Sequence, residues 1–181
     1  MKEGFISKKT CRGGKNVNGD QMEIKRKSTP NIQSMLTDRS RKSRSYLLDK
    51  LIELNRPIYP KEIALSENFD LLESLKELEE KGLIVLKDDG AIIGLYPVSA
   101  LKTPHKVRLE DGRSFYSMCA IDALGCVYEF NQDISISSSC KRCDSFISIE
   151  SKDKIFASVS PPTAYAMHVD IEKYRNWAAT C

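Results

Sequence analysis

Apolar residues recur at helical spacing in two segments of the first half of the chain. In residues 43–54 and again in residues 68–81, Leu, Ile, Phe and Tyr return every three or four positions, as they do on one face of a helix. Gly82 follows the second run and is a common C-cap residue. Pro60 stands between the runs, at a position typical of a first helical turn. We therefore expect three helices, the middle one short and spanning residues 60–65.

A hairpin of two apolar strands is expected after the third helix. Residues 83–86 and 91–96 are rich in Ile, Leu and Val, and the segment between them is Lys-Asp-Asp-Gly, a typical turn sequence. Three helices and a two-stranded hairpin make up a winged helix-turn-helix. We expect this unit to occupy residues 41–98.

The second half of the chain mixes short strand patterns with helical ones and shows no internal repeat. It predicts a small antiparallel sheet with helices, starting near Pro97. The fold class is therefore α+β, an N-terminal winged helix-turn-helix followed by this antiparallel-sheet core. Strands are expected at residues 107–109, 114–116, 134–138, 146–150 and 164–169, and helices at residues 118–130 and 170–179.

The composition is that of a foldable globular protein. The chain has 181 residues, 41% of them apolar, with only 9 Gly and 7 Pro, which suits one domain or two small ones and excludes collagen-like or low-complexity chains. The apolar stretch at residues 91–101 is much shorter than the roughly 20 residues that span a bilayer. The basic residues 1–9 are not followed by the apolar segment of a secretory signal. We therefore expect a cytoplasmic protein without a membrane partner.

The net charge of +3 conceals an uneven distribution. Residues 1–44 carry 12 Lys and Arg against 4 Asp and Glu, which leaves 16 against 21 for residues 45–181. A charge block without a periodic apolar face has nothing to pack against, so residues 1–40 are interpreted as a poorly ordered basic arm. The predicted reading helix at residues 68–81 has five acidic residues and two lysines. Such a helix suits phosphates poorly, and a nucleic-acid partner is not expected.

Six cysteines, five of them after residue 118, indicate where the chemistry lies. Without a secretory signal the thiols are expected to stay reduced, which favours metal binding or thiolate chemistry over disulfides. Cys119 falls where a strand gives way to a helix, so the helix dipole would favour its thiolate. Asp122 and Cys126 follow at i+3 and i+7 on the same helix face. Cys126 is interpreted as a small core residue, whereas an acid on that face needs a partner or a function.

The segment Phe-Tyr-Ser-Met-Cys-Ala-Ile-Asp-Ala-Leu at residues 115–124 resembles the catalytic segment of the organomercurial (alkylmercury) lyases. In that family an aromatic-rich strand leads into a Cys-Ala-[Leu/Ile]-Asp helix. The resemblance extends over most of residues 40–181 and includes the strand that ends in Cys140. It implies a lyase core over residues 99–181.

The resemblance implies cleavage of a carbon–mercury bond by protonolysis, with two cysteines, one aspartate and no required cofactor. Cys119 would be the first thiol, Asp122 the acid and Cys181 the second thiol, with mercury held by Cys119 and Cys181. The expected partners are an organomercurial substrate and, as acceptors of Hg(II), low-molecular-weight thiols or a mercuric reductase. Family members continue for some tens of residues beyond the second cysteine. The core is therefore expected to be C-terminally incomplete, with lyase turnover that is weak or absent.

The Cys140-x-x-Cys143 pair forms half of a tetrahedral zinc site. A zinc ion held by Cys140 and Cys143 is a secondary expectation, because no other candidate ligand stands at ligand spacing. His105 and His168 are interpreted as surface or packed residues. The candidates for the missing half of the site are Cys11, Cys126, His105 and His168.

Two other functions remain open at this point. A winged helix beside a basic arm is also typical of a transcriptional regulator, here one that responds to mercury or zinc. A catalytically inert relative that only binds mercury would carry the same thiols. Hydrocarbon release and binding to random duplex DNA separate these alternatives.

Overall fold

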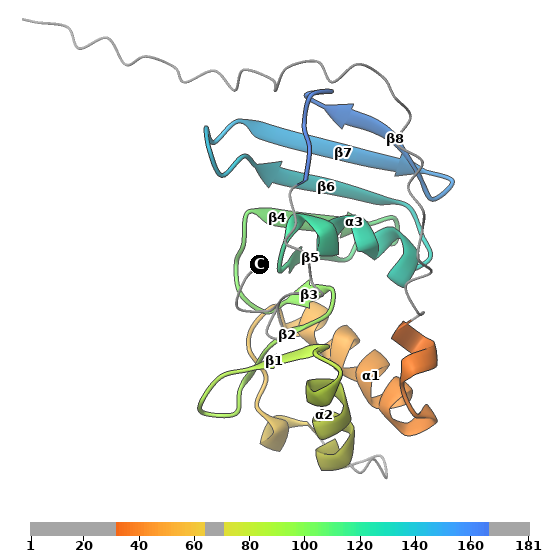
Figure 1. Ribbon diagram of the computed structural model, residues 1–181, viewed down its shortest axis with the longest axis vertical. Helices are drawn as coiled ribbons and strands as arrows, with labels where there is room; N and C mark the ends of the chain where they lie inside the picture. Colours follow the sequence, from red (N-terminus) through yellow and green to blue (C-terminus); the bar gives the residue numbers. More distant parts are fainter. Residues whose placement is uncertain (1–31, 64–70, 167–181) are drawn as a thin grey trace, which may run out of the picture.

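The computed structural model describes residues 32–63 and 71–166, which form helices at one end and an extended sheet above them (Figure 1). The helices, including two short 3-10 turns η1 and η2, are η1 Ile32–Met35, α1 Asp38–Leu54, η2 Pro60–Glu62, α2 Leu71–Glu80 and α3 Ala120–Glu129. The strands are β1 Ile84–Leu86, β2 Ile92–Leu95, β3 Val98–Ser99, β4 His105–Leu109, β5 Ser114–Ser117, β6 Ile134–Ser139, β7 Phe146–Lys152 and β8 Ile155–Ser160.

Helices α1 and α2 pack against each other through apolar and small side chains. Thr37 caps α1 by accepting a hydrogen bond from the Ser40 N–H at 3.3 Å, and α1 ends at Asn55, which adopts the left-handed conformation with φ 49°. The buried hydroxyls of Ser43 and Ser74 hydrogen-bond at 3.0 Å between the two helices. The leucines at the helical spacing of the sequence form the core between them: Leu47, Leu48, Leu51, Leu75 and Leu78.

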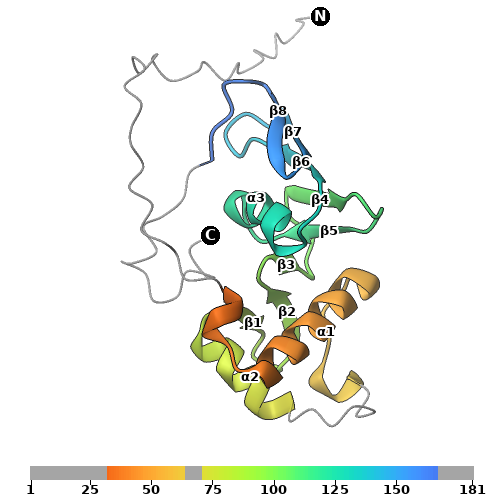
Figure 2. The same ribbon diagram turned by 90° about the vertical axis from the view of Figure 1, so that its right-hand side faces the viewer.

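All eight described strands form one sheet in the order β1-β2-β3-β5-β4-β6-β7-β8, and every neighbouring pair is antiparallel. The strands predicted at residues 107–109, 114–116, 134–138 and 146–150 and the helix predicted at residues 118–130 are confirmed as β4, β5, β6, β7 and α3. Helix α3 lies across β4 and β5 in both views (Figures 1 and 2). It covers Val107, Phe115 and Ile136. These residues are register partners on neighbouring strands, so their side chains lie on the same face of the sheet.

The N-terminal winged helix-turn-helix remains a prediction. Helices α1 and α2 and the β1–β2 hairpin are present, but the predicted helix at residues 60–65 contains only the 3-10 turn η2 before the described range ends at residue 63. The hairpin does not stand apart as a wing, because β2 also pairs with β3 and so joins the large sheet. The predicted basic arm, residues 1–40, overlaps η1 and the start of α1, and residues 1–31 lie outside the described part.

The end of the described chain differs from the prediction. The strand β8 was not predicted, because its residues alternate weakly and most are exposed. Residues 164–166 form no strand, so the prediction of a strand over 164–169 is wrong for its first three residues. The rest of that segment and the predicted helix at residues 170–179 lie outside the described residues.

A buried arginine joins the helical end to the sheet end. Arg44 of α1 has a side chain that is 1% exposed, and its guanidinium donates to Glu129 Oε1 at the end of α3, at 2.6 Å. It also donates to the backbone oxygen of Tyr96, between β2 and β3, at 2.6 Å. A buried guanidinium needs such partners, so α1, the β2–β3 turn and α3 are held together at this point.

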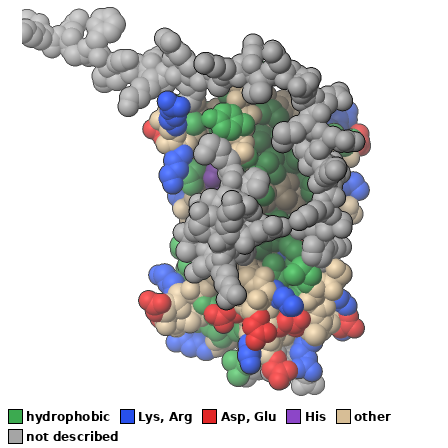
Figure 3. Space-filling model, viewed as in Figure 1, with side chains coloured by type: hydrophobic (Ala, Val, Ile, Leu, Met, Phe, Trp, Pro, Cys, Tyr) green, Lys and Arg blue, Asp and Glu red, His purple; other side chains and the backbone are tan. Residues whose placement is uncertain are grey.

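The surface differs between the two ends. Charged side chains of both signs gather over the α1–α2 end, whereas hydrophobic side chains are visible along the sheet (Figure 3). Among the described residues, the large exposed hydrophobic side chains near the outer strands are Phe146, Ile155, Val159 and Tyr165. No described helix is long and apolar enough to cross a membrane.

Candidate active site

Cys119 lies at the N-terminus of α3, directly after β5. Its backbone is extended, with φ −144° and ψ 176°, and its Sγ accepts a hydrogen bond from the Asp122 N–H at 3.5 Å. Cys119 is therefore the N-cap residue of α3, a position normally taken by Ser, Thr or Asp. The positive end of the helix dipole faces this sulfur. The predicted junction of strand, thiol and helix is confirmed.

Asp122 is a buried acid, 4% exposed. Its Oδ2 atom is buried and accepts no hydrogen bond from the described residues. Burial raises the pKa of Asp122 to about 6, and hydrogen bonds with Cys119 act in the opposite direction. A negative charge on the partnerless Oδ2 atom would be costly here, so the carboxyl binds a proton far more readily than a surface aspartate does. This carboxyl can therefore accept a proton and later donate it.

Cys126 completes the face of α3 that carries Cys119 and Asp122. Its thiol is 0% exposed, donates to the Asp122 backbone oxygen at 3.3 Å and lies 3.5 Å from Ser117 Oγ. Burial raises the pKa of Cys126 to about 12, so this group stays a thiol at physiological pH. The prediction that Cys126 is a core residue agrees with this burial, and Cys119 is the more accessible of the two sulfurs.

Tyr96, which sequence reasoning did not select, lies against the same helix. Burial, and after it the charge of Asp122, raise the pKa of Tyr96 to about 12. A Cβ atom built on Gly125 of α3 would lie 2.8 Å from Tyr96 Oη. Gly125 in the interior of a predicted helix was the available signal, because glycine there often marks a close approach by another group.

His105 packs on the same sheet face as the buried Ser117. The two residues are register partners in β4 and β5, and His105 Nδ1 lies 2.9 Å from Ser138 Oγ of β6. Burial lowers the pKa of His105, which favours the neutral ring. His105 is thus a packed residue, as expected from the sequence.

The geometry of α3 agrees with the comparison to known families. Residues 98–181 match the family model of the alkylmercury lyases, MerB. The matched range begins at β3 and contains Cys119, Asp122 and the Cys140/Cys143 turn. It also contains Cys181, which, like His168 and Cys11, lies outside the described residues.

A solved structure described as the mercury-bound form of MerB2 has a similar fold, with a TM-score of 0.55 and 20% sequence identity. The similarity covers 72% of this chain and 64% of that one, so the chain spans less than two thirds of the MerB2 structure. At this level of identity the likeness shows the mixed helix and antiparallel-sheet fold and nothing finer. No curated protein matches the sequence.

Within the part matched by the MerB model, Cys140 and Cys143 occupy the turn between β6 and β7. The Cys140 N–H donates to the Ser145 oxygen at 2.9 Å, and the Asp144 N–H donates to the Cys140 oxygen at 2.8 Å. Cys143 Sγ lies 3.2 Å from Ser145 Oγ. No group of three or more His, Cys, Asp or Glu residues among those described could hold a metal ion. Cys143 is disulfide-bonded, so the expectation that the thiols stay reduced is wrong for this residue. The expectation of zinc at this turn gains no support.

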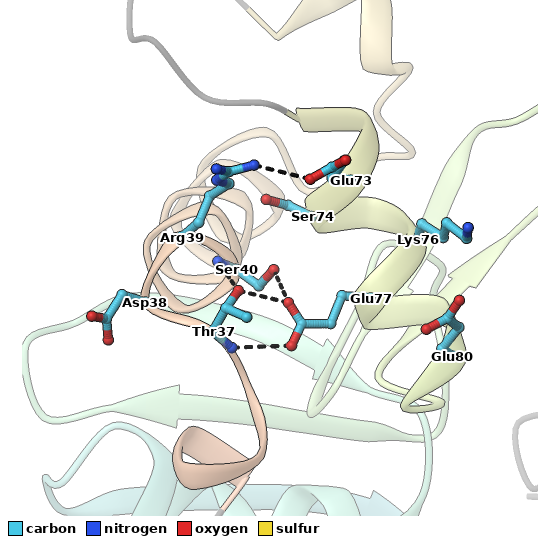
Figure 4. Close-up of a pocket in the computed structure, with 9 residues that line it drawn as sticks. All are labelled: Thr37, Asp38, Arg39, Ser40, Glu73, Ser74, Lys76, Glu77 and Glu80. Carbon is cyan, nitrogen blue, oxygen red and sulfur yellow. Dashed lines mark hydrogen bonds and ion pairs between the residues drawn. The ribbon is translucent and has the colours of Figure 1, made fainter.

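A groove lies between α1 and α2 (Figure 4). Glu77 of α2 points into it and accepts hydrogen bonds from the Thr37 N–H at 3.0 Å, the Thr37 hydroxyl at 2.7 Å and the Ser40 hydroxyl at 2.5 Å. These bonds lower the pKa of Glu77. The groove therefore serves the packing and capping of α1, and Cys119 and Asp122 do not line it.

Proposed function

We propose that this protein is an organomercurial lyase, which cleaves a carbon–mercury bond by protonolysis. The observation that carries the proposal is the pairing on α3 of a thiol at the helix N-terminus with a buried carboxyl three residues later. This pair lies inside the segment that matches the MerB family model. The MerB2 structure with bound mercury supports the fold on which the proposal rests.

Cys119 captures the substrate in this proposal. Mercury is a soft metal that prefers thiolate sulfur, and the N-terminus of α3 favours the thiolate form of a cysteine at its cap. Cys181 supplies the second thiolate, which raises the electron density on mercury and on the carbon bound to it. Cys119 and Cys181 together then hold the Hg(II) product.

Asp122 carries the proton. It accepts the proton that an incoming thiol loses and later donates it to carbon, a general acid–base role. The carbon–mercury bond breaks with its electron pair on carbon, a carbon–hydrogen bond forms, and Hg(II) remains on the thiolate sulfurs. A carboxyl whose burial raises its pKa to about 6 can accept and donate a proton near neutral pH.

No cofactor is needed for these steps, and mercury is substrate and product. Hg(II) then passes to low-molecular-weight thiols or to a mercuric reductase. The catalytic core is residues 99–181, and the α1–α2 unit within residues 41–98 is a structural or docking module. The exposed residues of α2 include Glu73, Glu79 and Glu80, which disfavours phosphate backbones as partners.

The test is incubation of reduced protein with phenylmercury and excess thiol, followed by detection of benzene. Asp122→Asn should bind mercury normally and release benzene at least about 100-fold more slowly, the usual size of a lost general acid. Cys119→Ser should lose both binding and release, and Tyr128→Phe, at an exposed position of α3, is the matched control.

Mercury binding, benzene release and a separate measurement of DNA binding distinguish the lyase from its alternatives. Mercury bound in full by wild type without any benzene would identify an inert mercury-binding relative. Normal release from Asp122→Asn would overturn the assignment of the acid. Tight binding of random duplex DNA in place of turnover would favour the regulator.

A further inference from the structure

Tyr96 and Gly125 fit together in a way that the fold does not require. Gly125 lies in the interior of α3, where glycine is a poor helix former. An alanine there would place its Cβ 2.8 Å from Tyr96 Oη but 3.8 Å from Cζ. The hydroxyl oxygen is therefore the atom that would have to shift to admit a side chain at position 125. A phenylalanine at position 96 would be compatible with alanine at position 125, and the chain has neither.

The backbone of Tyr96 is fixed from two sides. Its N–H donates to the Leu83 oxygen at 2.8 Å, and its carbonyl oxygen accepts from Arg44 at 2.6 Å. Arg44 also binds Glu129 at the last turn of α3. The backbone of Tyr96 is thus fixed by the same buried arginine that binds the last turn of α3.

The Asp122 carboxyl lies about one helical turn before Gly125 on α3. Asp122 is 4% exposed, and its Oδ2 accepts no hydrogen bond from the described residues. Burial raises the pKa of Tyr96, and the charge of Asp122 raises it further. Residues 122 and 125 are neighbours on one face of a helix, so the Asp122 carboxyl and the Tyr96 hydroxyl, which lies against Gly125, are on the same side of α3.

We propose that Tyr96 is a positioning residue of the lyase site, whose hydroxyl donates a hydrogen bond to the Asp122 carboxylate that forms when the proton moves to carbon. Gly125 leaves the space that the hydroxyl occupies. The inference rests on the proposed function. It assigns to Tyr96 a stabilising role without proton transfer, since Asp122 gives its proton to carbon and Tyr96 keeps its own.

The experiment compares wild type with Tyr96→Phe, Gly125→Ala and the double variant. Single-turnover benzene release from bound phenylmercury and thermal stability are measured on each, with Tyr128→Phe as the control. We expect Tyr96→Phe to keep mercury affinity and to release benzene about 10- to 100-fold more slowly, as for a lost hydrogen bond to a charged group. Gly125→Ala should be slow and less stable, because its methyl group displaces the hydroxyl.

The double variant decides between a functional and a steric role. Removal of the hydroxyl relieves the clash and the alanine favours the helix, so its stability should return to the wild-type level or above. Its benzene release should stay as slow as that of Tyr96→Phe. Release restored to the wild-type rate in the double variant, or unchanged release in Tyr96→Phe, would overturn the proposal.

A spectroscopic arm separates this proposal from the proposed function. In protein labelled with 13C at tyrosine Cζ and without substrate, the Tyr96 resonance should shift when Asp122 is replaced by Asn, whereas the Tyr128 resonance should not. A Tyr96 resonance that is unchanged in Asp122→Asn would contradict the proposed proximity of the Tyr96 hydroxyl and the Asp122 carboxyl. If wild type releases no benzene, the lyase assignment is contradicted, and so is the role of Tyr96 in turnover. This conclusion holds even if the Tyr96 resonance responds to Asp122→Asn.

Discussion

Arg44 of α1 and Glu129 of α3 form an ion pair with an N–O distance of 2.6 Å, and their side chains are 1% and 12% exposed. The two residues are far apart in sequence and belong to the helical end and the sheet end of the molecule. Their contact places the proposed catalytic helix relative to α1. It also connects the N-terminal unit to the helix that carries Cys119 and Asp122, the proposed site residues.

The first prediction is that Arg44→Met destabilises the fold by about 3 to 5 kcal/mol, because it leaves Glu129 as an uncompensated buried charge. Urea denaturation followed by circular dichroism measures this loss. The double variant Arg44→Met/Glu129→Gln should recover part of it. Arg39→Ala breaks the exposed pair with Glu73 and should cost less than about 1 kcal/mol. Equal losses of stability in Arg44→Met and Arg39→Ala would show that the buried Arg44–Glu129 pair stabilises the fold no more than an exposed pair does.

The second prediction concerns the pH dependence of stability. The folded-state pKa of Asp122 is about 6 and its ordinary value is 3.8, so the folded protein holds this proton more tightly than the unfolded chain. Ionised Asp122 therefore destabilises the fold above about pH 6, by about 3 kcal/mol at most, and has no such effect below about pH 4.

Asp122→Asn removes this penalty. The variant should be more stable than wild type at about pH 8, and the difference should shrink as the pH falls through 6 towards 4. Denaturation curves at four or five pH values measure it. A difference that does not change with pH would mean that Asp122 is not the buried acid described here.

The third prediction distinguishes the two cysteines of α3. Cys119 caps the helix and is partly exposed, whereas Cys126 is fully buried with a pKa of about 12. Iodoacetamide at neutral pH should therefore alkylate Cys119 much faster than Cys126, as read by peptide mass spectrometry. Cys126→Ala should keep benzene release near the wild-type rate. Fast labelling of Cys126 in folded protein would contradict its place in the core.

The β4–β5 hairpin and α3 were predictable from the sequence because their signals are local. Gly112 adopts a φ of 91° in the turn between the strands, and the strand pattern at 114–116 changes to helical spacing at Cys119. The N-terminal position of Cys119 and the shared face with Asp122 follow from that spacing alone. The places of Cys119 and Asp122 on α3 could therefore be predicted from the sequence, whereas Cys181 lies outside the described residues.

Other features could not be predicted because they depend on contacts distant in sequence. Strand β3 has two residues and exists through its pairing with β2 and β5. Arg44 stands on a helix of many charged residues, and nothing local distinguishes it from its exposed neighbours, since arginine is seldom fully buried. Tyr96 comes near α3 because β3, which follows it in sequence, pairs with β5, the strand that leads into this helix.

The last prediction concerns the turn that carries Cys140 and Cys143. Backbone hydrogen bonds from Cys140 to Ser145 and from Asp144 to Cys140 close this turn, so its shape does not depend on a metal ion. We expect protein purified without added zinc to contain well under one zinc per chain by elemental analysis. Cys140→Ser should keep its melting temperature within a few degrees of wild type, because Cys140 forms no disulfide and is partly exposed, and changes at such positions are usually small. A full equivalent of zinc that is lost together with folding in this variant would instead make the turn a structural metal site completed by residues outside the described part of the chain.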